Sequence, residues 1–166
     1  MTAMATVTVQ PGSADRWWEY RDLRLAALAS DPDAFTSAYD TEADLADDQW
    51  RARSAMPGTF IGYLDGQPAG TAGLVPGTGP RRDLVGVWTT PAARGHGVAE
   101  ALCGAVIEMA QQSGAVTVAL QVAEHAHAAR RLYQRLGFTD TGRREPMPKK
   151  PTHTLIEMTL SLGHCG

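Results

Sequence analysis

One short segment of the 166-residue chain combines a fixed positive charge with two glycines at a point where a helix is expected to begin. It reads Thr90-Pro91-Ala92-Ala93-Arg94-Gly95-His96-Gly97-Val98-Ala99. The start of a helix exposes unpaired backbone N–H groups and the positive end of the helix dipole, and both attract phosphate. Because Gly95 and Gly97 carry no Cβ, a pyrophosphate could approach the main chain closely. The segment therefore indicates a phosphate site, with a Gly-rich surface turn that contains an arginine as the alternative.

The residues on either side of this loop predict the elements that hold it in place. Residues 83–89 form a nearly continuous apolar run, which suits a strand buried on both faces. Residues 97–112 repeat apolar side chains at helical spacing, and Gly114 follows as a stop signal. A strand over 116–122 comes next, so the three elements should form a right-handed parallel crossover.

The remaining segments complete a mixed α/β sheet in the order β-α-α-β-β-β-α-β-α-β-β. Asp65-Gly66 is a strong hairpin signal, because both turn positions tolerate a positive φ. A chain of 166 residues fits one domain, and we expect it to span 1–166. The other expected strands are 6–9, 59–64, 67–75, 138–143 and 154–162, and the other expected helices are 15–30, 45–54 and 126–136.

Composition narrows the class of protein. With 43% hydrophobic and 20% charged residues the chain is an ordinary globular protein, and its net charge of −3 argues against a nucleic-acid binder. It has no apolar run of 18 residues and no signal-peptide pattern at its start, so we expect a cytoplasmic protein outside membranes. Cys103 should be a core residue and Cys165 an exposed thiol, and these two cysteines predict neither a disulfide framework nor a metal site.

Two motifs give the chain a resemblance to a known family. Arg94, Gly97 and Ala99 match the Arg/Gln-x-x-Gly-x-Gly/Ala signature of the GCN5-related N-acetyltransferase (GNAT) superfamily. Residues 129–138, Ala-Arg-Arg-Leu-Tyr-Gln-Arg-Leu-Gly-Phe, resemble its second hallmark, Ala-x-x-Leu-Tyr-x-x-x-Gly-Phe. The resemblance covers almost the whole chain, and two motifs in the right order are far more specific than either alone. It implies the GNAT fold and an acyltransferase.

The resemblance implies acetyl-CoA as the cosubstrate and assigns residues to its parts. Main-chain groups of Trp88 and Thr89 would pair with the pantetheine arm, and backbone N–H groups from Arg94 to Ala99 would hold the pyrophosphate. In the superfamily the strands that match 83–89 and 116–122 splay apart, and the cofactor enters the gap. The implied cofactor contacts, with Gln121 beside the acyl group, are Trp88, Thr89, Thr90, Arg94, Gly95, His96, Gly97, Val98, Ala99, Gln121, Ala129 and Tyr133.

Tyr133 and Asp83 are the implied catalytic residues. Tyr133 matches the usual general acid of the superfamily, and a phenol with a pKa of about 10 can protonate a departing thiolate. The alternative for Tyr133 is an amphipathic core residue. Asp83 lies eleven residues before Arg94, where histone-acetylating relatives place a catalytic glutamate. A solvated residue at the start of a strand is the alternative for Asp83, with water as the base.

Three further features leave alternatives open. Ala126 stands where many members carry a cofactor-binding asparagine, so that contact is missing here. His125 and His127 resemble a metal-ligand pair, but no third ligand follows at a suitable spacing, and a surface pair at a helix start fits better. The five carboxylates of residues 40–48 fit a solvated face, or else they attract a cationic amine.

The resemblance leaves three functions open. The first is transfer of an acetyl group to a primary amine of a small molecule. The second is the same reaction on a protein N-terminus or lysine, and the third is a non-catalytic acyl-CoA-binding sensor module. Members of the superfamily often dimerise, so a homodimer is also compatible with the resemblance.

Overall fold

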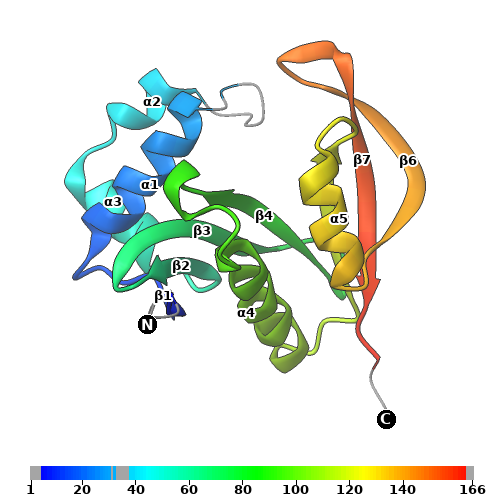
Figure 1. Ribbon diagram of the computed structural model, residues 1–166, viewed down its shortest axis with the longest axis horizontal. Helices are drawn as coiled ribbons and strands as arrows, with labels where there is room; N and C mark the ends of the chain where they lie inside the picture. Colours follow the sequence, from blue (N-terminus) through cyan, green and yellow to red (C-terminus); the bar gives the residue numbers. More distant parts are fainter. Residues whose placement is uncertain (1–4, 31, 33–37, 164–166) are drawn as a thin grey trace.

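The computed structural model describes residues 5–30, 32 and 38–163; Cys165 and the first four residues lie outside this part of the chain. The described residues form one seven-stranded sheet in the order β1-β2-β3-β4-β5-β7-β6 (Figure 1). All neighbouring strands are antiparallel except β4 and β5. The strands are β1 (Val7–Pro11), β2 (Thr59–Leu64), β3 (Gln67–Pro76), β4 (Arg81–Thr89), β5 (Thr117–Ala123), β6 (Thr139–Met147) and β7 (Lys150–Ser161).

Helices cover both faces of this sheet. They are α1 (Trp17–Ser30), α2 (Tyr39–Ala43), α3 (Asp47–Ala55), α4 (Val98–Gln112) and α5 (His127–Arg135), with a 3₁₀ turn at Pro91–Ala93. Strand β2 shows how the faces divide, because successive side chains of a strand point to opposite sides. Ile61 and Tyr63 pack with Leu23 and Ala27 of α1. Gly62, between them, faces α4.

Gly62 shows why a glycine is needed where α4 crosses the sheet. A Cβ built on Gly62 would lie 2.9 Å from Val98 Cγ1 and 3.1 Å from Leu102 Cγ. Real Cβ atoms essentially never show the first distance and rarely show the second, so the missing side chain lets α4 lie close to β2. Both Val98 and Leu102 are buried as a result.

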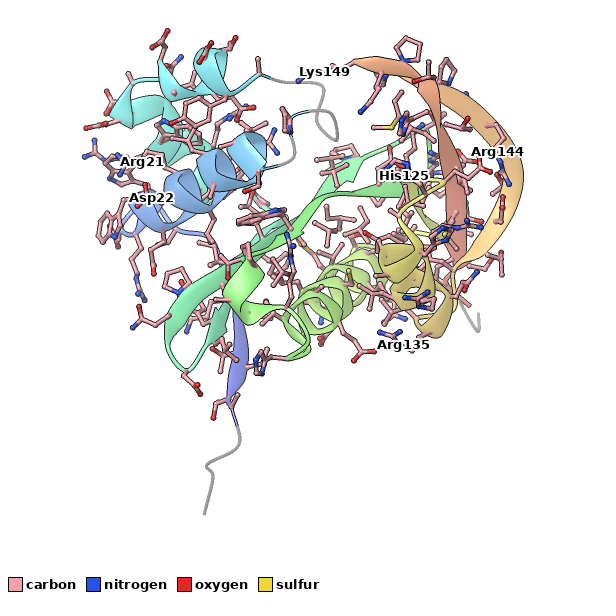
Figure 2. All side chains as sticks on the ribbon, turned by 45° about the horizontal axis from the view of Figure 1, so that its top comes forward. Arg21, Asp22, His125, Arg135, Arg144 and Lys149 are labelled. Atoms are coloured by element: carbon pink, nitrogen blue, oxygen red, sulfur yellow. The ribbon has the colours of Figure 1, made fainter. Side chains whose placement is uncertain are left out.

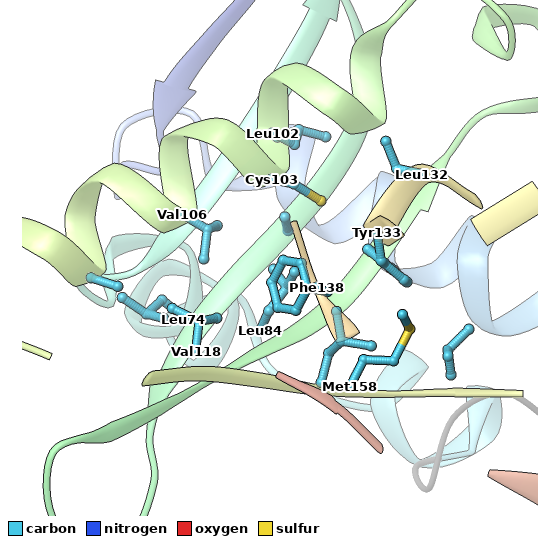
Figure 3. Packing of buried hydrophobic residues seen from close by; sticks show 14 of the residues in the cluster. Leu74, Leu84, Leu102, Cys103, Val106, Val118, Leu132, Tyr133, Phe138 and Met158 are labelled. Carbon is cyan, nitrogen blue, oxygen red and sulfur yellow. The ribbon is translucent and has the colours of Figure 1, made fainter. Parts of the chain in front are cut away.

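The main core lies between the sheet, α4 and α5. Leu102, Cys103 and Val106 of α4 meet Val118 of β5 there, and Figure 3 shows Tyr133 and Phe138 packed beside them. The prediction that Cys103 is a core residue is confirmed. Burial raises the pKa of the Cys103 thiol to about 12, with a smaller contribution from Glu100. Cys103 is therefore a packing residue and not a nucleophile.

The predicted fold class is confirmed, and the predicted order of elements holds with the addition of one short helix, α2. The Asp65-Gly66 hairpin is also present, with φ of 51° and 80° at its two turn residues. The last two strands are longer than predicted, because β6 and β7 extend to a tight turn at Pro148-Lys149 and form a long hairpin. None of the described helices is long and apolar enough to cross a membrane.

Candidate active site

The two parallel strands at the centre of the sheet separate along their length. Their pairing is confined to Arg81–Thr117, Arg82–Val118 and Asp83–Ala119, although β4 continues to Thr89 and β5 to Ala123. Beyond Asp83 the edge of β4 that faces β5 has no strand partner. Its backbone N–H and C=O groups on that side can therefore pair with an extended ligand, as at any open strand edge. This is the splay that the sequence resemblance implied.

A β-bulge bends β4 where the separation begins. Thr71 of β3 pairs with Trp88 and Gly73 pairs with Val85, so two residues of β4, Gly86 and Val87, lie opposite one residue of β3. Gly86 has a φ of 62°, in the left-handed region that favours glycine. The Thr71 hydroxyl donates to the Gly86 carbonyl at 3.1 Å and fixes the bulge.

The separated strands enclose a cleft of about 870 Å³. Five of the residues predicted for the site, Asp83, Trp88, Gln121, Ala129 and Tyr133, line it. The others, from Thr89 to Ala99, follow directly after Trp88 and lie outside the lining. The Trp88 side chain packs with Leu23 and Ala27 on the α1 side of the sheet, so a cofactor in the cleft would meet mainly its backbone.

The N-terminus of α4 has the features that were predicted to attract phosphate. Gly97 is the N-cap with a φ of 86°, and no side chain of the described residues caps it. Gly95 also has a positive φ, and a Cβ on either glycine would meet nothing within 4 Å. Arg94 is exposed, and its Nε donates to the Thr89 carbonyl at 3.3 Å, which joins the loop to the end of β4. The first N–H groups of a 15-residue helix thus face open space.

Tyr133 lies on α5 in the wall of the cleft. Its side chain is buried, and its ring meets Phe138 edge-on at a centroid distance of 5.9 Å. Burial raises the pKa of the Tyr133 phenol far above its ordinary value, and the neighbouring Cys103 raises it further. The hydroxyl therefore carries its proton at every physiological pH and can donate a hydrogen bond into the cleft.

Asp83 lies at the narrow end of the cleft, at the last position where β4 and β5 still pair. Its carboxylate accepts a hydrogen bond from Arg81 Nε at 3.0 Å. Arg81 also donates to Glu157 at 3.2 Å, and the Thr141 hydroxyl donates to the other oxygen of Glu157. The Asp83 carboxylate is therefore engaged by Arg81, and a role as base would require it to reach the acceptor nitrogen from within this ion pair.

Gln121 and the small residues of α5 line the opposite side. Gln121 Nε2 donates to Glu145 at 3.3 Å, which directs this side chain across β7 toward β6. Ala126 and Ala129 both line the cleft, and Ala126 is the N-cap of α5 without a side-chain hydrogen bond. The contact that an asparagine would make at Ala126 has no side-chain substitute at this position.

A second group of side chains lines the cleft from α1 and α3, and sequence reasoning missed it. Arg24 donates to both oxygens of Glu42 at 3.0 Å, and Arg53 donates to the same carboxylate at 2.6 Å. Burial opposes ionisation of Glu42, but these hydrogen bonds outweigh it and lower the Glu42 pKa. Both arginines line the cleft. No periodicity marks them, because the cluster joins three helices.

Glu42 belongs to the acidic segment 40–48, and its position changes the interpretation of that segment. The other four carboxylates, on Asp40, Asp44, Asp47 and Asp48, are exposed, and none of them lines the cleft. The lining on this side carries arginines instead. The geometry fits the solvated-face interpretation and does not fit attraction of a cation into the cleft.

A histidine pair is the other feature that the sequence did not reveal. His125, in the β5–α5 loop, and His153, on β7, both line the cleft, and their Nδ1 atoms lie 3.2 Å apart. The sequence grouped His125 with His127, but His127 is exposed outside the lining. His125 and His153 lie 28 positions apart in the chain. Only the pairing of β5 with β7 brings them together.

The fold and the cleft define an acyltransferase of the GNAT type, and comparison with known proteins agrees. Residues 18–138 match the family model described as the acetyltransferase (GNAT) family. The chain therefore belongs to the GNAT family of acetyltransferases. No curated protein matches the chain significantly in sequence.

Solved structures share the fold over nearly the whole chain. A GCN5-related N-acetyltransferase from Kribbella flavida is 25% identical with a TM-score of 0.73, over 94% of this chain and 98% of its own. The yncA protein from Salmonella typhimurium, solved with its cofactor acetyl-CoA, is 19% identical with a TM-score of 0.75, over 96% of each chain. The ribosomal-protein-S18-alanine N-acetyltransferase from Escherichia coli is 17% identical with a TM-score of 0.69, over 97% of each chain.

Proposed function

We propose that the protein transfers the acetyl group of acetyl-CoA to a primary amine of a small molecule. The observation that carries this proposal is the cleft between β4 and β5, which has a protonated Tyr133 in its wall and an uncapped helix N-terminus beside it. A binding module needs only the phosphate site and the strand edge, whereas turnover also needs a proton donor, a role that Tyr133 would add to its packing in the core.

The residues around the cleft fit acetyl-CoA. Its pantetheine arm carries amide groups that suit the open backbone edge at Trp88 and Thr89. Its pyrophosphate suits the N–H groups from Arg94 to Ala99, where Gly95 and Gly97 leave open space. A neighbour with the same fold was solved with acetyl-CoA. When bound, acetyl-CoA would supply an activated thioester.

Tyr133 would act as the general acid. The reaction releases a thiol, so a proton has to reach sulfur as the carbon–sulfur bond breaks. Burial keeps the phenol protonated, but the raised pKa also makes Tyr133 a weaker acid than a free phenol, so proton transfer requires the negative charge that develops on sulfur beside it. The Phe138 contact fixes the ring, because an edge-on aromatic pair restricts its orientation. Tyr133 therefore holds a proton at one defined place in the cleft wall.

One hydrogen bond joins the β6–β7 hairpin to the segment that follows α1. Lys149 Nζ, in the turn of the β6–β7 hairpin, donates to the Pro32 carbonyl at 3.2 Å, just after α1 (Figure 2). Neither Lys149 nor Pro32 lines the cleft, so this contact does not define the width of its opening. The choice of a small acceptor over a protein is therefore part of the proposal, and the turnover screen below tests it.

Acetylation of a protein is the second candidate, because a neighbour of the same fold acetylates a ribosomal-protein alanine. A turnover screen decides between the two. Purified protein with acetyl-CoA is offered a library of small amines and, separately, peptides with free N-termini or lysines, and thiol release is measured. Turnover with small amines alone supports the proposal, and turnover with peptides alone supports the second candidate. Acetyl-CoA binding without turnover of any amine would make the protein a sensor.

A further inference from the structure

Two histidines in the cleft wall, His125 and His153, contact each other through their Nδ1 atoms, and this contact constrains their tautomers. The rings of His125 and His153 meet edge-on at a centroid distance of 4.7 Å, and their Nδ1 atoms lie within hydrogen-bond distance at 3.2 Å. Neither Nε2 has a hydrogen-bond partner among the described residues. Both rings line the cleft that also contains Tyr133 and Asp83. The general acid described above has no use for this pair.

A hydrogen bond between two Nδ1 atoms requires opposite tautomers. One neutral ring carries its proton on Nδ1 and donates it, which leaves a lone pair on its Nε2. The other ring accepts at Nδ1 and carries its proton on Nε2. The pair therefore presents one basic nitrogen and one N–H group at its two ends. His125 is exposed and His153 is partly buried, so a proton released from the pair to water would leave from His125.

We propose that His153 and His125 form a proton relay that takes the proton from the acceptor ammonium and delivers it to water. This inference rests on the proposed transfer to an amine. The ammonium gives a proton to Nε2 of His153. The Nδ1 proton of His153 passes to Nδ1 of His125, and the Nε2 proton of His125 leaves to water. The amine is then neutral with a free lone pair, and both rings are neutral in exchanged tautomers, which proton exchange with water restores.

The surroundings of the pair bear on this assignment. Glu124 precedes His125 in the chain, and Arg130 donates to the Glu124 carbonyl. Lys150 lines the same cleft, as do Arg24 and Arg53, which are both paired with Glu42. Asp83 is the competing base, but its carboxylate is held by Arg81. Two imidazole nitrogens at this separation could also share a metal ion, although the described residues contain no group of three ligands.

The first test reads the tautomers in the intact protein and needs no substrate. Nitrogen-15 NMR of the histidine side chains should show one ring protonated at Nδ1 and the other at Nε2. In His153→Asn the signal of His125 should change, while His127→Asn, on the exposed neighbour, should leave both rings as they were. Identical tautomers in the wild type, or no response of His125 to His153→Asn, would overturn the relay.

The second test compares two acceptors of the same shape. n-Butylamine is an ammonium at neutral pH, whereas in O-propylhydroxylamine an oxygen replaces one CH₂ and the nitrogen is already neutral. The double variant His125→Asn/His153→Asn should lose about 10²-fold in kcat/KM with n-butylamine and less than about tenfold with O-propylhydroxylamine. Asparagine keeps a polar group near Nδ1 but accepts no proton. His127→Asn should match the wild type, and thermal unfolding confirms that each variant folds.

The outcomes separate this inference from the proposed function. Equal losses with both acceptors, or no loss, would overturn the relay while wild-type turnover keeps the proposed function. Loss of wild-type activity in EDTA would replace the relay with a shared metal ion. If the wild type releases no thiol with either probe or any amine of the library, the proposed function fails, and the catalytic role of the pair fails with it.

Discussion

The two sides of the cleft present different chemical groups, backbone on one side and side chains on the other. The proposed cofactor side, defined as residues 84–99, offers mainly backbone: the open edge of β4, glycines with space before them and the first turn of α4. The proposed acceptor side, defined as Arg24, Arg53, His125 and His153 together with Glu42, which binds both arginines, offers side chains from helices, a loop and a strand. A ligand common to a whole family can be held by backbone. The side that selects the acceptor has to differ through side chains.

The largest expected effect is on kcat and comes from the hydroxyl of Tyr133, which lies in the wall of the cleft. Tyr133→Phe should lower kcat by about 10²–10⁴-fold, because the proton donor is lost. The acetyl-CoA affinity should stay within about twofold, since the ring and its contact with Phe138 remain. Because burial raises the Tyr133 pKa above the usual value of about 10, the ratio of wild-type to variant rates should be constant from pH 7 to 10. Wild-type turnover in the variant would return Tyr133 to a packing role.

Acetyl-CoA binding should weaken when a bulky apolar side chain is placed on the cofactor side, although no polar or charged group is removed. Gly97→Val should weaken acetyl-CoA binding about 10- to 100-fold in titration calorimetry, because the side chain fills the space before the N–H groups. Gly114→Val is the matched control at the other end of α4. Its φ of 82° is close to the 86° of Gly97, and its surroundings are equally open. Equal affinities for the two variants would remove the phosphate site from α4.

The cofactor side could be predicted from the sequence, whereas most of the acceptor side could not. The phosphate loop was predicted from a local motif, whereas the splayed strands and the role of Tyr133 were implied by the family resemblance, which itself depends on two local motifs. The pair of His125 with His153 and the cluster at Glu42 depend on long-range contacts, for which no local spacing exists. Helix α2 was missed for a related reason. It is five residues long, too short for a periodic pattern, and it is anchored by Glu42.

The ion-pair cluster at Glu42 should also contribute to the stability of the fold. Glu42→Gln removes the charge that two arginines share in a buried position. We expect the free energy of unfolding to fall by about 2 kcal/mol, less than for a fully buried pair because Arg53 is 38% exposed. Chemical denaturation measures this change. Asp44→Asn, on the exposed part of the same segment, is the control and should change stability by less than about 0.5 kcal/mol.

No effect on the KM of the acceptor is expected from the exposed carboxylates of the acidic segment. Asp44→Asn combined with Asp47→Asn should leave the KM of the acceptor within about twofold, because exposed charges outside the cleft are screened by salt. Acceptor kinetics at low and moderate ionic strength measure it, with the KM of acetyl-CoA followed in parallel. A clear rise of the acceptor KM in this double variant would restore the acidic segment as an attractor of the amine.

The most direct measurement is hydrogen–deuterium exchange of the intact protein with and without acetyl-CoA. Binding along a backbone edge and a helix N-terminus should slow exchange of amides in residues 84–89 and 95–100. Peptides from α2 and α3, residues 39–55, should be unchanged, because the acceptor side does not hold the cofactor. Protection of both segments of the cofactor side is the predicted result. Protection confined to other elements, or none at saturating acetyl-CoA, would contradict a cofactor site between β4, β5 and α4.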